Sequence, residues 1–173
     1  MARRGKKQRK AQLATLLAVG EGPADKAFIN HLKDLYSKNT GQRVTVEAED
    51  GGSPATMIRN VIRKHRHADY DRRVLVLDED VSILEPDIAK ARKANIELII
   101  STPVCLEGML LRVLEQQVPN GATATYCKNQ LHPQLSGRET RRESYRGLFP
   151  KPVIDNTTKE QIVRLRQLML NAH

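Results

Sequence analysis

Short apolar runs and helical apolar patterns alternate over the first two thirds of the chain. Residues 12–19 (QLATLLAV) form a mostly apolar run that stops at Gly20, which is typical of a buried strand. Residues 24–39 then place apolar side chains three and four positions apart, as an amphipathic helix does. The sequence RVTVEAE at 43–49 alternates apolar and polar positions, which predicts a second strand.

The alternation continues to about residue 116. Its clearest part is 74–77 (VLVL), which is apolar at every position and should be a strand buried on both faces. The remaining predicted elements are helices over 54–66, 85–95 and 103–117 and a strand over 96–102. This order predicts an α/β fold, a Rossmann-type parallel sheet with helices on both faces.

The last third of the chain has a different composition. Between about 119 and 152, Pro, Gly, Asn and Thr are frequent and the apolar period weakens, so we expect an irregular loop or a small lid. Residues 157–171 (TTKEQIVRLRQLMLN) predict a terminal amphipathic helix capped by Thr157 or Thr158. The expected organisation is a single domain over 12–173 behind a tail at 1–11.

Positive charge is concentrated at the N-terminus. The chain carries +9, and residues 1–10 (MARRGKKQRK) hold six Lys/Arg and no acid, which leaves 23 basic and 20 acidic residues elsewhere. Two interpretations stay open: a tail that binds a polyanion such as nucleic acid, or a disordered tail that aids solubility. Aromatic residues make up only 3%, so nucleic acid contacts should be mainly with phosphates rather than through base stacking.

The remaining composition points to the cytoplasm. No apolar stretch approaches the ~20 residues of a membrane helix, and the basic tail lacks the apolar segment of a secretory signal. Cys105 and Cys127 are in no metal-ligand spacing, so we expect reduced thiols, with Cys105 in the core. We therefore expect a cytoplasmic protein without a membrane partner.

Acidic residues follow two of the predicted strands. Glu21 lies just past the first strand, and Asp78 and Asp80 lie just past VLVL. Residues two apart in an extended segment point to the same side, so Asp78 and Asp80 should aim at one point, with Glu79 turned away. Ligands of such sheets bind outside the carboxyl ends of the strands, and converging carboxylates suit Mg²⁺ or Mn²⁺.

A structural interpretation of the same residues is also open. D-x-D is a weak motif, and Asp78 could simply cap the turn that follows it. Glu21 and Asp25 could be no more than acids that favour the N-terminus of a helix.

The two acidic segments resemble the Toprim signature. The pattern G-E-G-x-x-D matches Gly20, Glu21, Gly22 and Asp25, and D-x-D matches 78–80. Toprim domains occur in topoisomerases, bacterial primases, the overcoming-lysogenization-defect nucleases and ribosomal-RNA maturases.

A narrower resemblance is to the RloB-like family. Its members have a basic N-terminal tail, a turn of the form E-G-x-x-T-E and a segment S-N-P-C-F-E-x-W-L-L. This chain reads STPVCLEGMLLRVLE at 101–115, with one extra residue before Cys105. It departs from the pattern where T-E is Ala24-Asp25, where the aromatic is Leu106 and where the Trp is Met109.

The resemblance implies a metal-dependent nuclease of an anti-phage defence module, often accompanied by an ABC-type ATPase. By this analogy Glu21 is the general acid or base, and Asp78 and Asp80 bind magnesium with Glu21. Asp25 would be a further metal ligand or a neighbour of one, and Glu107 would join from the start of the next helix. RNA, tRNA in particular, is favoured over DNA as the substrate by the same analogy.

Several basic residues are candidates for binding nucleic acid. We expect phosphate contacts from the expected lid and from the residue after Asp25. They are Lys26, Arg138, Arg141, Arg142 and Arg146. By contrast, His132 and the other histidines considered, at 31, 65 and 67, have no mutual metal-ligand spacing and receive no role.

Two non-catalytic functions are the alternatives. The chain could be a nucleic acid-binding subunit whose acidic residues only cap helices, or a regulatory partner of an ATPase that docks through its terminal helix. A homodimer through that helix is a further expectation.

Overall fold

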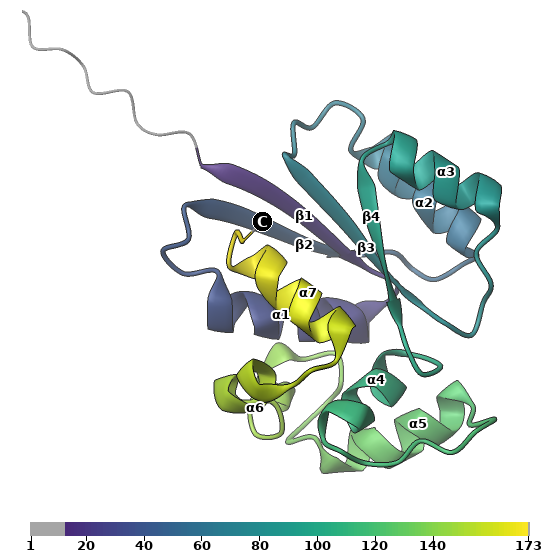
Figure 1. Ribbon diagram of the computed structural model, residues 1–173, viewed down its shortest axis with the longest axis vertical. Coiled ribbons are helices and arrows are strands. Elements are labelled where there is room, and N and C mark those ends of the chain that lie inside the picture. The colour runs from purple at the N-terminus through teal and green to yellow at the C-terminus, as the bar shows by residue number, and fades with distance from the viewer. Residues whose placement is uncertain (1–12, 173) are drawn as a thin grey trace, which may run out of the picture.

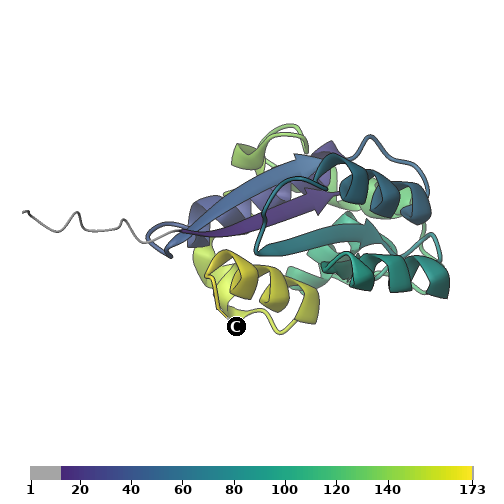
Figure 2. The same ribbon diagram turned by 90° about the horizontal axis from the view of Figure 1, so that it is seen from above.

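The computed structural model describes residues 13–172, and the predicted basic tail at 1–11 lies outside that range. Its centre is a four-stranded parallel sheet in the order β2-β1-β3-β4, and Figure 2 shows the strands pointing the same way. The strands are β1 (Ala14–Gly20), β2 (Gln42–Ala48), β3 (Arg72–Asp78) and β4 (Ile96–Ser101). The predicted α/β class is confirmed.

Helices cover both faces of the sheet (Figure 1). On one face α2 (Pro54–Lys64) and α3 (Glu85–Lys93) pack on alternate residues of β1 and β3, such as Leu17 and Leu75. On the other face α1 (Pro23–Tyr36), α4 (Leu106–Val113) and α7 (Glu160–Met169) pack on the intervening residues. Because β1 and β3 are inner strands buried on both faces, they appear in the sequence as continuous apolar runs.

The direction of winding reverses between β1 and β3. From β1 the chain passes through α1 to β2 on one side, whereas from β3 it passes through α3 to β4 on the other side. The connections therefore diverge at the carboxyl ends of β1 and β3. This switch point is the place where open parallel sheets bind their ligands.

The segment 119–152 is more ordered than its composition indicates. It contains α5 (Ala124–Leu131) and the 3₁₀ turns η1 (His132–Gln134) and η2 (Arg142–Tyr145), and α6 (Lys151–Asn156) follows. Cys127 and Leu131 of α5 are buried in the core that includes α4. The helix was missed because it is short and has few apolar positions, and it depends on this packing.

The terminal helix is present, but it is shorter than expected and capped differently. Its N-cap is Lys159, which makes no side-chain capping bond, so the predicted capping by Thr157 or Thr158 is wrong. The side chains of Ile162, Leu165 and Leu168 are at most 1% exposed. The apolar face of α7 therefore belongs to the core of this chain.

Two further expectations can be compared with the structure. Cys105 and Cys127 are free and buried, which confirms that Cys105 packs in the core. No helix within residues 13–172 is long and apolar enough to cross a membrane.

Candidate functional site

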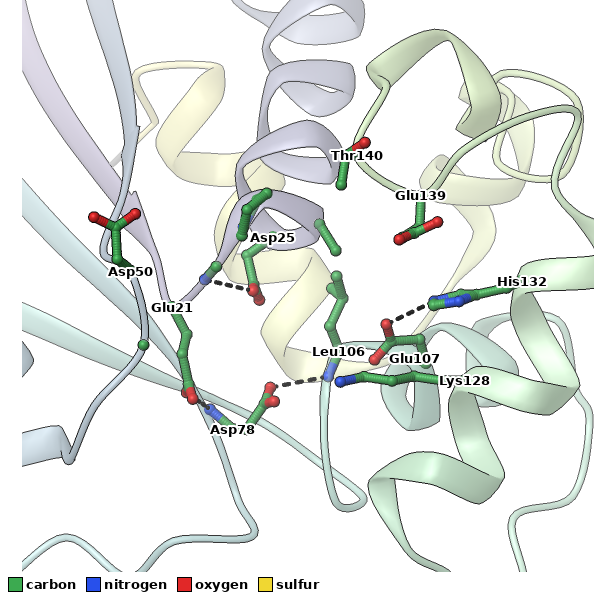
Figure 3. Close-up of a pocket in the computed structure, with 14 residues that line it drawn as sticks. Glu21, Asp25, Asp50, Asp78, Leu106, Glu107, Lys128, His132, Glu139 and Thr140 are labelled. Carbon is green, nitrogen blue, oxygen red and sulfur yellow. Dashed lines mark hydrogen bonds and ion pairs between the residues drawn. The ribbon is translucent and has the colours of Figure 1, made fainter.

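A pocket of about 490 Å³ opens beside the switch point, at the carboxyl ends of β1 and β3 (Figure 3). Six acidic residues line it, and four of them are candidates from the sequence: Glu21, Asp25, Asp78 and Glu107. The other lining residues are Gly22, Pro23, Ala24, Asp50, Gly51, Leu106, Lys128, His132, Glu139 and Thr140.

Glu21 is positioned by the turn between β1 and α1. Its Oε2 accepts a hydrogen bond from the backbone N–H of Asp78 at 3.0 Å. The turn depends on Gly20, because a Cβ there would collide with the Cβ of Asp25. Gly22, in contrast, has an extended φ of −142°, which any residue can adopt. The first glycine of the G-E-G turn thus lets α1 pack closely on the end of β1.

Asp25 lies in the first turn of α1 and is only 6% exposed. Its Oδ2 accepts a hydrogen bond from Gly22 N–H at 3.0 Å, as the capping interpretation proposes. Its Oδ1 is buried and has no hydrogen-bond partner within residues 13–172. Burial, with the charges of Glu107 and Glu21, raises the pKa of Asp25 to about 7. Helix capping therefore accounts for one carboxylate oxygen and not for the other.

Asp78 is the last residue of β3. Its Oδ1 accepts a hydrogen bond at 3.0 Å from the N–H of Leu106, the first residue of α4. Asp78 thus caps a helix, but the helix is α4 and not the turn that directly follows it. Burial and the charges of Asp25 and Glu21 raise the pKa of the Asp78 carboxyl to about 8.

Asp80 is placed differently from Asp78. Asp80 is exposed and does not line the pocket. The expected convergence of the two side chains is not found, because β3 ends at Asp78 and the strand alternation does not continue into the turn. The backbone N–H groups of Glu79 and Asp80 instead donate to the carbonyl of Val104, at 3.0 and 3.1 Å.

Val104 is the extra residue in the resemblance to the RloB-like segment. It adopts a left-handed conformation with φ of 68°, which is rare for a β-branched side chain. Its N–H donates to Oε2 of Glu79 at 2.8 Å, so the loop before α4 is bound to the turn after β3 from both sides. Val104 thereby joins the turn after Asp78 to the loop that precedes α4.

Glu107 lies in the first turn of α4 and is 4% exposed. Its Oε1 is 2.9 Å from Nε2 of His132, to which the sequence analysis assigned no role. Lys128 from α5 also lines the pocket and was not considered from the sequence. Lys128 and His132 are four residues apart, which places both on one side of α5 and its end. The sequence alone does not reveal this, because α5 was not predicted.

The candidate phosphate-binding residues are divided between two places. Lys26, Arg141 and Arg142 line a second cavity of about 440 Å³, which shares Pro23 and Thr140 with the acidic pocket. Arg138 is exposed and does not line this cavity. Arg146 lies further along α1, where its Nη2 is 3.9 Å from Asp34.

The acidic pocket offers oxygen ligands to a metal ion. Among residues 13–172, however, no three His, Cys, Asp or Glu side chains stand close enough to hold a metal ion as they are placed. The donor set itself suits Mg²⁺, because it consists of carboxylates and includes the unpartnered Oδ1 of Asp25. Side-chain movements would be needed to close a coordination shell.

No protein-family model, no curated protein and no solved structure matches this chain. The resemblance to Toprim and RloB-like proteins therefore stays a prediction from its motifs.

Proposed function

We propose that this protein is a metal-dependent nuclease that hydrolyses phosphodiester bonds of nucleic acid. The observation that carries the proposal is the convergence of Glu21, Asp25 and Asp78 on one pocket at the switch point of the sheet. Each of the three carboxylates has one oxygen bound to a backbone N–H, which fixes its position. Within residues 13–172, the other oxygen of each accepts no such bond.

The electrostatics of the pocket favour a cation. The pKa values of Asp25 and Asp78 rise to about 7 and about 8, because both groups are buried and repel their acidic neighbours. A divalent cation held by Asp25, Asp78 and Glu21 would relieve this repulsion. When bound, such an ion would polarise the phosphoryl group and lower the pKa of an attacking water.

The chain's own residues have distinct roles in this proposal. Glu21, fixed by its bond to Asp78 N–H, would accept the proton of the attacking water. Lys128 would place a positive charge beside the reacting phosphate. His132 would hold Glu107 through their 2.9 Å contact. Asp80, which lies outside the pocket, has no part in the reaction.

The test is a cleavage assay on total tRNA and on single- and double-stranded DNA, with Mg²⁺, Mn²⁺ or a chelator. Asp78→Asn is the informative variant, because the amide keeps an oxygen to accept the Leu106 N–H and loses only the charge. We expect cleavage that requires metal and falls at least ~100-fold in Asp78→Asn. Asp80→Asn is the control and should retain most of the activity. Family analogy favours tRNA as the preferred substrate.

Binding without cleavage would contradict the proposal. If no metal supports cleavage, and wild type and Asp78→Asn bind these polymers equally with chelator, the chain is a binding or regulatory subunit. An ATPase partner and a role in anti-phage defence would then have to be sought by isolating the complex.

A further inference from the structure

We propose that a single nucleic acid strand reaches the acidic pocket along a basic groove between α1 and the segment 140–151. The inference rests on the proposed function and specifies its substrate path. The groove begins at the cavity that contains Lys26, Arg141 and Arg142, which shares Pro23 and Thr140 with the pocket. A separate cavity of about 410 Å³ lies further along α1 and is lined by Asp34, Lys38, Arg146 and Lys151 among others. We infer that the strand passes from one cavity to the other over the Asp34–Arg142 contact.

Both cavities follow the same side of α1. The first is lined by Lys26 and Asn30 of α1 and the second by Asp34 of α1, so the helix contributes a residue at every fourth position. Lys38, two residues past the end of α1, also lines the second cavity. From Lys26 to Asp34 the helical part of this row covers ~12 Å at 1.5 Å per residue. At ~3.4 Å per stacked nucleotide, this length matches about three to four nucleotides.

The opposite wall of the groove is anchored to α1. Phe28 makes edge-on contacts with Tyr145 and Phe149, with ring centres 5.5 and 5.8 Å apart. Nε2 of His31 lies 2.7 Å from the carbonyl oxygen of Phe149. At the far end of α1, Tyr36 donates to Asp155 at 2.8 Å. The groove is therefore preformed, which reduces the entropic cost of binding a flexible strand.

The charges along the groove suit a phosphate backbone. Lys26, Lys38 and Arg141 are exposed and form no ion pair within residues 13–172. Arg142 and Arg146 both lie near Asp34, at 3.3 and 3.9 Å. Arg142 also pairs at 2.9 Å with Glu143, which lines the first cavity. An arginine has five N–H donors, so each keeps donors for phosphate after these contacts.

The groove is suited to contacts with the phosphate backbone rather than with the bases. His31 is the only aromatic side chain among the residues that line either cavity, and it is buried and bonded to Phe149, so no aromatic ring there offers a stacking platform. A flexible single strand can also follow such a groove more closely than a stiff duplex can. We therefore expect similar affinity for different sequences and weaker binding of a duplex.

The experiment measures binding separately from cleavage. Asp78→Asn protein is titrated with fluorescein-labelled single-stranded RNA and DNA in chelator, at several salt concentrations, and anisotropy is recorded. In this background, Lys26→Gln/Arg141→Gln removes two charges from the groove. Arg59→Gln/Lys93→Gln is the matched control, because it removes the same charge from α2 and α3 on the other face.

The groove variant should lower the slope of log K against log salt by ~1.4, since each phosphate contact to a single strand contributes ~0.7. At 0.1 M salt this corresponds to binding at least ~10-fold weaker. The control should change neither quantity. Asp34→Asn removes the acid from the middle of the groove and should tighten binding, whereas Asp69→Asn, an equal charge change at an exposed site elsewhere, should not.

Equal losses in the groove variant and its control would overturn the proposal, as would duplex binding as tight as that of the single strand. The outcome is distinct from that of the cleavage assay. If the protein cleaves nothing but shows these binding effects, the proposed nuclease activity is wrong and the proposed groove stands. If the protein cleaves nucleic acid but the groove variant binds as tightly as its parent, the nuclease activity stands and the proposed groove is wrong.

Discussion

The acidic turn after β1 illustrates how much depends on single atoms. The G-E-G sequence resembles a phosphate-binding turn, yet its first glycine has a packing role, since a Cβ at Gly20 would collide with Asp25. The close approach of α1 buries Asp25 and leaves its Oδ1 without a partner. One missing side chain thus creates the environment in which a carboxylate favours a cation.

Gly20→Ala should destabilise the protein by ~1–3 kcal/mol, because the added methyl group overpacks the contact with Asp25. It should also impair metal binding, since Asp25 must move. Gly22→Ala is the control: its φ of −142° suits alanine, and the nearest atom to its Cβ is Asp25 Oδ2 at 3.8 Å. Urea unfolding of both variants measures the difference. Equal stability of the two variants would show that the contact at Gly20 relaxes freely.

The raised pKa of Asp78 makes stability dependent on pH. An acid whose pKa is higher in the folded state stabilises the fold while it is protonated and loses that contribution as pH rises towards its folded pKa, here about 8. Metal-free wild type should therefore become less stable between about pH 4 and pH 8. Asp78→Asn should show a smaller decline. Thermal unfolding in chelator at pH 5 and pH 8.5 measures both slopes.

Divalent metal provides the complementary observation. Mg²⁺ should raise the melting temperature of wild type at pH 8.5 more than at pH 5, because protonated carboxyls are poor ligands. An equal pH dependence in Asp78→Asn and wild type would contradict the assigned cause.

Among the elements, α5 has the largest effect on the character of the pocket. It brings Lys128 to the pocket wall, and His132 follows directly after it. The helix has only eight residues, a length at which isolated helices are unstable. Its order depends on packing against α4 and on the cap provided by Thr123, whose Oγ1 accepts from Tyr126 N–H at 3.2 Å.

Thr123→Ala should cost about 1 kcal/mol of stability through loss of this cap. If Lys128 assists cleavage, activity should fall as well, because the helix that carries it becomes frayed. Thr123→Ser keeps a hydroxyl acceptor and should behave as wild type in both denaturant unfolding and the cleavage assay. A Thr123→Ala protein with unchanged stability would show that the α4 contacts alone hold α5.

At the scale of the whole molecule, α7 from the C-terminal part of the chain covers one face of the sheet. The apolar residues of α7 pack in the same core as α1 and α4. Arg72 donates to Gln42, to Asn171 and to the carbonyl of Ala172, which joins β3, β2 and the end of the chain. Docking of a partner through the apolar face of α7 would therefore require that face to leave the core.

Leu165→Ala should destabilise the protein by about 2–5 kcal/mol, because Leu165 is 0% exposed and the substitution leaves a cavity. Leu170 is the C-cap of the same helix and is 45% exposed. Leu170→Ala should therefore change the free energy of unfolding by less than ~0.5 kcal/mol. Chemical denaturation of both proteins gives the comparison. Similar small losses would mean that α7 is detachable, and the docking hypothesis would then regain support.

Periodicity was sufficient to predict the sheet, its flanking helices and the positions of Glu21 and Asp78 at strand ends. It succeeded because inner strands of a parallel sheet need continuous apolar runs, and because ligand-binding residues follow such strands. These properties are local, so they can be read from neighbouring residues in the sequence.

Which side chains line the pocket could not be predicted from neighbouring residues in the sequence. Asp80 lies outside the pocket because β3 ends two residues before it and the strand alternation does not reach it. Lys128 and His132 line the pocket because α5 packs on α4. Both outcomes depend on contacts between segments far apart in the chain. Sequence patterns therefore predicted where the site lies, whereas the packing of distant elements determined which side chains form it.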